Sequence, residues 1–247
     1  MSLKEEWNRR AKKDAFRYVS AFRKDWDEES FYRWGEIQTR IVIDRFFESL
    51  GVDPSSLKAL EIGCGAGRMS RALASRFKFV FAYDVSEEYA SIAKEKNSQL
   101  KNVVFAVNDG VSFPEIEDET IDFVFSGWTM QHMPTKEIVV KNIEELARIL
   151  RKNGLYKIDP ATTESRMKEN IISSIARSRI AGIIAPLFGA DKLLLSPTWR
   201  GARFEEKEIL AVLSNNKLSA KTFFEDDGLG LFYGKKVTRR WFCGEKL

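Results

Sequence analysis

Short apolar runs alternate with amphipathic segments between residues 51 and 160, and this alternation restricts the possible folds more than any other feature. The runs are apolar on both faces, as the strands of a parallel sheet covered by helices must be. The expected strands span residues 57–62, 79–83, 103–107, 121–125 and 155–158. Helices are expected between them, including 68–77 and 135–150, the latter stopped by Asn153-Gly154. The sequence therefore predicts a doubly wound α/β core over residues 51–160.

The segments on either side of this core have different patterns. Trp7, Ala11 and Tyr18 recur at helical spacing, so residues 1–50 are expected to form an N-terminal helical cap. Residues 161–203 are rich in Ile and Leu and predict a helical insertion that acts as a lid. Residues 204–247 are expected to hold one helix and two final strands. The prediction is one domain, 1–247, with a seven-stranded, mostly parallel sheet.

Composition excludes several classes of protein. The 247 residues are 44% hydrophobic and 31% charged, which fits one globular domain, and the net charge of +4 does not by itself indicate nucleic-acid binding. The charged N-terminus lacks an apolar signal core, and residues 171–188 are too polar for a membrane span. Cys64 and Cys243 are expected as free thiols. We expect a cytoplasmic protein without a membrane partner, either a monomer or a homodimer.

A glycine-rich loop, Glu61-Ile62-Gly63-Cys64-Gly65-Ala66-Gly67, follows the first expected strand. Alternate glycines permit a tight turn and a close approach to a ligand, and the next helix begins at once. A dinucleotide site needs Gly or Ala at the sixth position from Gly63, where this chain has Arg68. A phosphate-binding P-loop needs Gly-Lys-Ser/Thr, which is absent.

The spacing Glu-x-Gly-x-Gly-x-Gly instead resembles the first motif of class I S-adenosylmethionine-dependent methyltransferases. The resemblance extends from about Trp34 to the C-terminus and is strongest over residues 57–159. It implies a Rossmann-like fold, S-adenosylmethionine as cofactor and S-adenosylhomocysteine as product. It places Glu61, Gly63, Gly65 and Gly67 against the cofactor.

Further positions match the same family residue by residue. Asp84 ends the second strand, where the family has an acid that accepts from both ribose hydroxyls, and Val85 would pack on the adenine. Asn108-Asp109-Gly110 follows the third strand. The resemblance implies that Asp109 accepts from the adenine amino group and that the Gly110 N–H donates to a ring nitrogen. The less favoured alternative is that Asp84 and Asp109 are ordinary strand-end or turn acids.

The remaining candidate residues lie after the fourth strand and in the cap. Ser126 begins Ser126-Gly127-Trp128-Thr129, at the place where the family contacts the methionine part of the cofactor. Trp34 and Arg40 would close over the amino-acid end of the cofactor, or would form a helix-packing surface. His132, the single histidine, is a candidate general base, although orienting the following helix is the favoured role.

The acceptor is left open by the sequence. Methyltransferases acting on amino groups of bases or glutamine often carry Asn/Asp-Pro-Pro-Tyr/Phe where this chain has Ser126-Gly127-Trp128-Thr129, so a small-molecule acceptor with an O, N or C nucleophile is expected. Two alternatives are an RNA or protein acceptor, supported only by the pI of about 8.9, and cofactor binding without catalysis. No His/Cys/carboxylate cluster has ligand spacing, so no metal is expected.

Overall fold

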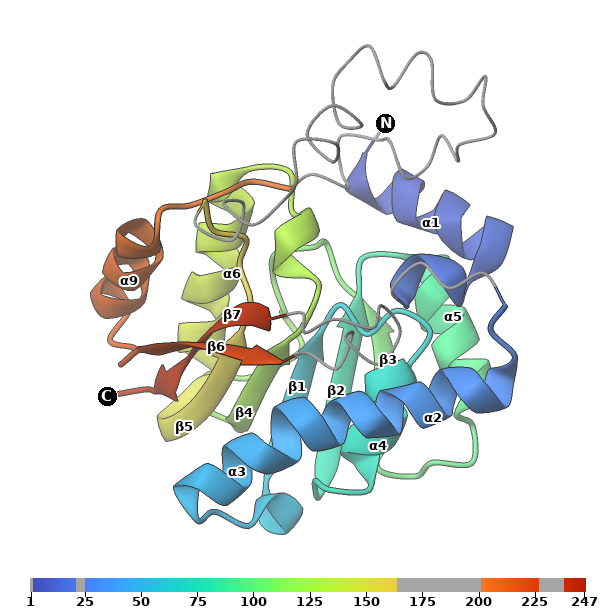
Figure 1. Cartoon of the computed structure of the whole chain (residues 1–247), viewed down its shortest axis with the longest axis horizontal. Helices are drawn as coiled ribbons and strands as arrows, with labels where there is room; N and C mark the ends of the chain where they lie inside the picture. The colour runs from blue at the N-terminus through green and yellow to red at the C-terminus, as the bar shows by residue number, and fades with distance from the viewer. Residues whose placement is uncertain (1, 21–24, 164–200, 227–237) are drawn as a thin grey trace.

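A computed structural model describes residues 2–20, 25–163, 201–226 and 238–247 (Figure 1). The predicted lid falls largely on residues 164–200, outside the described residues. The α-helices are α1 Leu3–Asp14, α2 Glu28–Thr39, α3 Arg45–Leu50, α4 Arg68–Ala74, α5 Glu87–Lys96, α6 Lys136–Ile149 and α9 Glu206–Asn215, and a π-helical turn, η2 Arg40–Asp44, joins α2 to α3. The strands are β1 Lys58–Ile62, β2 Phe79–Asp84, β3 Val103–Val107, β4 Ile121–Ser126, β5 Leu150–Ile158, β6 Lys221–Asp226 and β7 Thr238–Glu245.

The strands form one seven-stranded sheet in the order β3-β2-β1-β4-β5-β7-β6. β1 to β5 pair in parallel, while β7 is antiparallel to both β5 and β6. The predicted fold class is therefore confirmed. Chain order reverses across β1, since β2 lies on one side of it and β4 on the other, and ligands of such sheets bind at that switch point.

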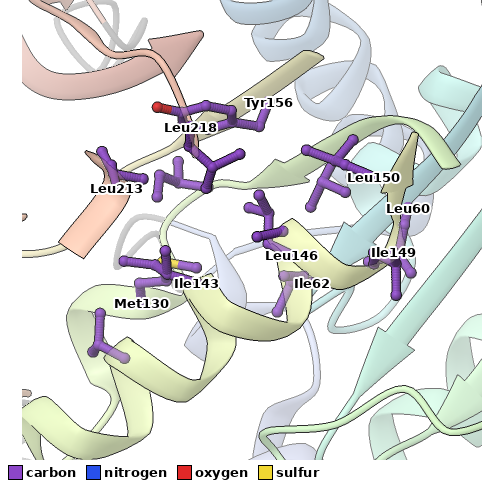
Figure 2. Close-up of a cluster of buried hydrophobic side chains, with 14 of the residues drawn as sticks. Leu60, Ile62, Met130, Ile143, Leu146, Ile149, Leu150, Tyr156, Leu213 and Leu218 are labelled. Atoms are coloured by element: carbon purple, nitrogen blue, oxygen red, sulfur yellow. The ribbon is translucent and has the colours of Figure 1, made fainter. Parts of the chain in front are cut away.

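Two apolar cores cover the two faces of the sheet. On one face, Ile143 and Leu146 of α6 pack with Leu213 of α9 against Leu60 and Tyr156 (Figure 2). On the other face, α3 and α4 pack through the cluster Val42, Ile43, Phe46, Phe47, Met69 and Leu73. This double cover explains why the central strands are apolar on both sides.

The N-terminal helices pack over the β1–α4–β2–α5 half of the molecule. α1 lies along α5, with Trp7 edge-on to Tyr89 at a ring-centroid distance of 6.2 Å. α2 crosses α4, and a Cβ on Gly35 would lie 2.2 Å from the backbone oxygen of Arg68. The two helices are therefore in backbone contact, which only a glycine permits here. The expected helical cap is present in residues 2–20 and 25–50.

The structure corrects the expected ends of several elements. Asn153-Gly154 does not stop the helix before β5, because α6 already ends at Ile149 and Leu150 begins the strand. Asn153 instead has a left-handed φ of 60° inside β5, where the register with β4 shifts. The helix expected over 68–77 ends at Ala74, and the late helix begins at Glu206 rather than residue 204. A propensity pattern locates an element better than it locates its ends.

Within the described residues, no helix is long and apolar enough to cross a membrane.

Candidate functional site

The glycine-rich loop lies at the carboxyl end of β1 and turns through three left-handed residues. Gly63, Gly65 and Gly67 have φ values of 78°, 53° and 77°. The N–H groups of Gly63 and Cys64 both donate to the carbonyl of Tyr83 at the end of β2, at 2.7 and 2.9 Å. The loop is therefore fixed to the neighbouring strand, and each glycine is required by the backbone conformation.

The close approaches at these glycines are to protein atoms. A Cβ on Gly63 would lie 2.2 Å from Thr129 Oγ1, and one on Gly65 would lie 3.0 Å from Val19 Cγ1. The loop thus touches the β4 end on one side and the N-terminal cap on the other. The glycines that we predicted as ligand contacts also make this packing possible.

Asp84 is the acid that the structure brings to this loop. Its side chain is 9% exposed; Oδ2 accepts from the Gly65 N–H at 2.9 Å and Oδ1 accepts from the Ser86 N–H at 2.9 Å. Burial raises the pKa of Asp84 to about 6, against the effect of these backbone hydrogen bonds. Each carboxylate oxygen has two lone pairs, so the carboxylate can accept further donors beside these two N–H groups. The predicted pairing with two ribose hydroxyls is compatible with this geometry.

Glu61 lies deeper than expected. Its carboxylate accepts from the Ser70 hydroxyl at 2.5 Å and from no N–H of the loop among the described residues. Burial raises its pKa to about 7, while the Ser70 hydrogen bond and Arg68 lower it.

Cys64 lies inside the loop and is buried. Because burial raises the pKa of its thiol, Cys64 acts as a small packing residue rather than as a nucleophile.

The predicted adenine contacts gather at the ends of β2 and β3. Asn108 donates its N–H to the Asp84 carbonyl at 3.1 Å, and a Cβ on Gly110 would lie 3.4 Å from Val85 Cγ2. The Gly110 N–H donates to Asn108 Oδ1 at 3.2 Å, so the predicted bond to an adenine ring nitrogen requires this contact to be shared or released.

Asp109 caps the turn that follows. It accepts from the N–H groups of Val111 and Ser112 at 2.8 and 2.6 Å, and from the Ser112 hydroxyl at 2.8 Å. Burial acts in the opposite direction, but these hydrogen bonds leave the pKa of Asp109 below its usual value. Its role toward an adenine amino group stays a prediction.

The end of β4 carries a strained residue that the sequence did not reveal. Trp128 has a left-handed φ of 62°, which is unfavourable for a bulky side chain. Its N–H donates to both carboxylate oxygens of buried Asp159, at 3.0 and 2.9 Å. Asp159 follows β5, and its only sequence signal was the Asp-Pro pair that closes the fifth expected strand.

His132 lies beneath α1. Its ring is 5.4 Å from that of Trp7, nearly perpendicular to it, and its Nε2 lies 3.2 Å from Gln131 Nε2. The histidine is therefore half-buried between the cap and the β4–α6 connection. Its role as a base stays a prediction.

The two cap residues predicted to meet the cofactor differ. Trp34 is buried, directly before Gly35 in α2. Arg40 is exposed and lies beside Glu36, whose carboxylate pairs with Arg76 beyond the C-terminal end of α4. Since the loop joins the other end of α4, the structure does not bring Arg40 to the predicted site. Spacing along α2 could not show which way that helix crosses α4.

Three buried polar side chains around the loop have polar atoms without a hydrogen-bond partner among the described residues. These atoms are Ser126 Oγ, Tyr89 OH, and Nε and Nη1 of Arg68. Such atoms are rare in folded proteins and mark places where a polar ligand can bind. A cofactor that carries a carboxylate, an ammonium group and ribose hydroxyls fits this set. No group of three or more metal-ligating side chains occurs in the described part of the chain.

Comparisons with known proteins agree with this geometry. Residues 60–158 match a family model described as a methyltransferase domain. Phosphoethanolamine N-methyltransferase 1 of Caenorhabditis elegans is 29% identical over 114 residues, covering 44% of this chain and 24% of that protein. 2-Methyl-6-phytyl-1,4-hydroquinone methyltransferase of Synechocystis is 33% identical over 108 residues, covering 42% of this chain and 32% of that protein. The matches therefore span about a quarter to a third of these relatives.

A solved structure extends the likeness to almost the whole chain. Magnesium protoporphyrin IX methyltransferase from Synechocystis, determined with bound S-adenosylhomocysteine, has a TM-score of 0.63 at 18% identity, covering 99% of this chain and 98% of that one. At this identity the likeness shows the fold. Residues 60–158 therefore match a methyltransferase domain, and the chain has the Rossmann-like fold that class I S-adenosylmethionine-dependent methyltransferases share.

Proposed function

We propose that this protein transfers the methyl group of S-adenosylmethionine to a nucleophilic O, N or C atom of a small molecule. One observation carries the proposal: a glycine loop with three left-handed residues lies against the buried carboxylate of Asp84 at the switch point of the sheet. The matched methyltransferase domain covers both features.

Methyl transfer from S-adenosylmethionine requires few catalytic groups from the protein. The sulfonium already activates the methyl group when the cofactor is bound, so the chain must bind it, align a nucleophile in line and exclude water. Asp84 would hold the ribose, with Val85 and Gly110 against the adenine. Glu61 and Ser126 would supply polar groups near the amino-acid end. No metal is needed for this chemistry.

The small-molecule acceptor rests on two arguments. Relatives are named for phosphoethanolamine and for a hydroquinone, which are both small molecules. The β4 end also carries Ser126-Gly127-Trp128-Thr129, with Trp128 fixed by Asp159, rather than a proline-rich motif for planar amino groups. Trp128 would form a wall of the acceptor site, and His132 would serve as base if the nucleophile is a hydroxyl.

A label-transfer experiment tests the proposal. The protein is incubated with methyl-labelled S-adenosylmethionine and, separately, with a cellular ultrafiltrate, total RNA and total protein. We expect label in the ultrafiltrate and none with Asp84→Ala. Label confined to RNA or protein would refute the small-molecule acceptor. Cofactor binding without label transfer in any fraction would show a binding protein without catalysis.

A further inference from the structure

Arg68 is an arginine buried at the centre of the candidate site. It is the residue after Gly67 and the first residue of α4, and it is 7% exposed. Its one hydrogen bond among the described residues is long: Nη2 donates to the Val19 carbonyl at 3.4 Å. Nε and Nη1 have no partner there. The guanidinium has five N–H donors, and most of them lack a hydrogen-bond acceptor among the described residues.

No carboxylate of the described residues pairs with this cation. The charge of Glu61 acts on Arg68, yet the hydrogen bond of the Glu61 carboxylate is with Ser70. Burial lowers the pKa of Arg68 to about 10, and Glu61 only partly opposes this. A buried charge without a hydrogen-bonded partner is costly, and folded proteins keep one mainly where a ligand completes it.

The cover over Arg68 also points to a ligand. The Arg68 guanidinium carbon lies 6.0 Å from the ring centroid of Phe31 and 5.7 Å from that of Trp128. Gly35 lets α2 sit directly on its backbone. The groups packed around the Arg68 guanidinium are therefore aromatic rings and backbone. The planar set of N–H donors of the guanidinium is the polar feature of this part of the site. Such a planar fork of donors fits a carboxylate with two parallel hydrogen bonds.

We propose that Arg68 binds the carboxylate at the amino-acid end of S-adenosylmethionine. This inference rests on the proposed function and goes beyond it, because Arg68 entered the sequence argument only as a residue that excludes a dinucleotide. Arg68 takes the place in the site that we had expected Arg40 to fill. The side chain leaves the loop beside Glu61 and reaches Trp128 at the end of β4, so it spans the region between the two strands that frame the switch point.

Two ligands that differ only in the carboxylate test the inference: S-adenosylmethionine and its decarboxylated form. Calorimetry should show that the wild type binds the first at least about tenfold more tightly. In Arg68→Met, the affinity for S-adenosylmethionine should fall by about 10- to 100-fold, while that for the decarboxylated ligand changes less than about threefold. Arg68→Lys should retain part of the preference, because it keeps the charge but loses the fork.

The unfolding of the ligand-free protein gives a second readout. Removing an uncompensated buried cation should leave the unfolding midpoint of Arg68→Met no lower than that of the wild type. Arg71→Met is the matched control on the same helix, because Arg71 donates to Asn97 and Lys96 at 2.6 Å and lies over the Tyr32 ring. It should lower the midpoint and leave the preference between ligands intact.

Three results would overturn the inference. One is equal binding of both ligands by the wild type, which needs no variant at all. Another is an equal loss of both ligands in Arg68→Met together with a lowered midpoint, which identifies a structural arginine. The third is unchanged binding of S-adenosylmethionine by Arg68→Met, which leaves the proposed function standing. If the wild type binds neither ligand, the proposed function itself is wrong.

Discussion

Replacing Asp84 with Asn removes one of the two acceptor oxygens at the carboxyl end of β2. In the structure Oδ1 and Oδ2 each accept one backbone N–H, from Ser86 and Gly65, at 2.9 Å. An amide keeps one of these acceptors and presents N–H donors where the other was. It also loses the negative charge and one remaining lone-pair site for a ribose hydroxyl.

The effect on stability comes from two opposing contributions. Losing a backbone hydrogen bond in a buried position lowers the free energy of unfolding by about 1–3 kcal/mol. Burial raises the Asp84 pKa from 3.8 to about 6, so the ionised side chain disfavours folding near pH 7.5 by about 3 kcal/mol, a cost that Asn removes. The two nearly cancel, and we expect the free energy of unfolding of Asp84→Asn to differ little from that of the wild type.

The effect of Asp84→Asn on cofactor affinity is not offset by an opposing contribution. A hydrogen bond to a charged acceptor contributes about 1.5–3 kcal/mol, so Asp84→Asn should bind S-adenosylhomocysteine about 10- to 150-fold more weakly at pH 7.5. Calorimetry measures the affinity and urea unfolding the stability. Asp122→Asn is the control, because Asp122 accepts the Lys58 N–H at 2.7 Å at the opposite end of the sheet. Wild-type affinity in Asp84→Asn would refute the assignment of Asp84 to the ribose.

Two further predictions follow from pKa and backbone geometry. Burial raises the pKa of Asp84 to about 6 and that of Glu61 to about 7. Between about pH 4 and 7 the folded protein therefore binds more protons than the unfolded one. The contribution of these two acids to the free energy of unfolding should fall as pH rises through that window. Cofactor affinity, which needs the ionised acids, should rise over the same window, and a flat calorimetric pH profile would contradict this. Gly63→Ala should lower the free energy of unfolding by well over the roughly 1 kcal/mol expected for Gly51→Ala. Both glycines have a positive φ, but of the two only Gly63 has a neighbour within contact distance of an added Cβ, namely Thr129 Oγ1 at 2.2 Å. Equal losses in urea unfolding would show that the Thr129 contact is of no consequence.

The sequence predicted the parts of the fold that depend on local pattern. Strands apolar on both faces located β1 to β5, and the helical spacing of apolar residues located α1. These features depend on neighbours in the sequence.

The features that were missed depend on contacts between distant residues. Lys157 on β5 is buried and donates to the Val42 carbonyl at 2.8 Å, within the π-helix Arg40–Asp44, and no local pattern shows this irregular turn. Asp159 became a site residue only through its bond to Trp128, 31 residues earlier. Arg68 was visible as a letter in the motif, but its burial follows from how α2 crosses α4.

The central claim, that the loop from Glu61 to Gly67 binds an adenosyl amino acid rather than a dinucleotide, is tested most directly by titrating the unmodified protein with S-adenosylhomocysteine and with NAD in the same buffer. The account predicts a saturable calorimetric signal at micromolar S-adenosylhomocysteine and none with NAD. Tight binding of NAD with no response to S-adenosylhomocysteine would contradict it.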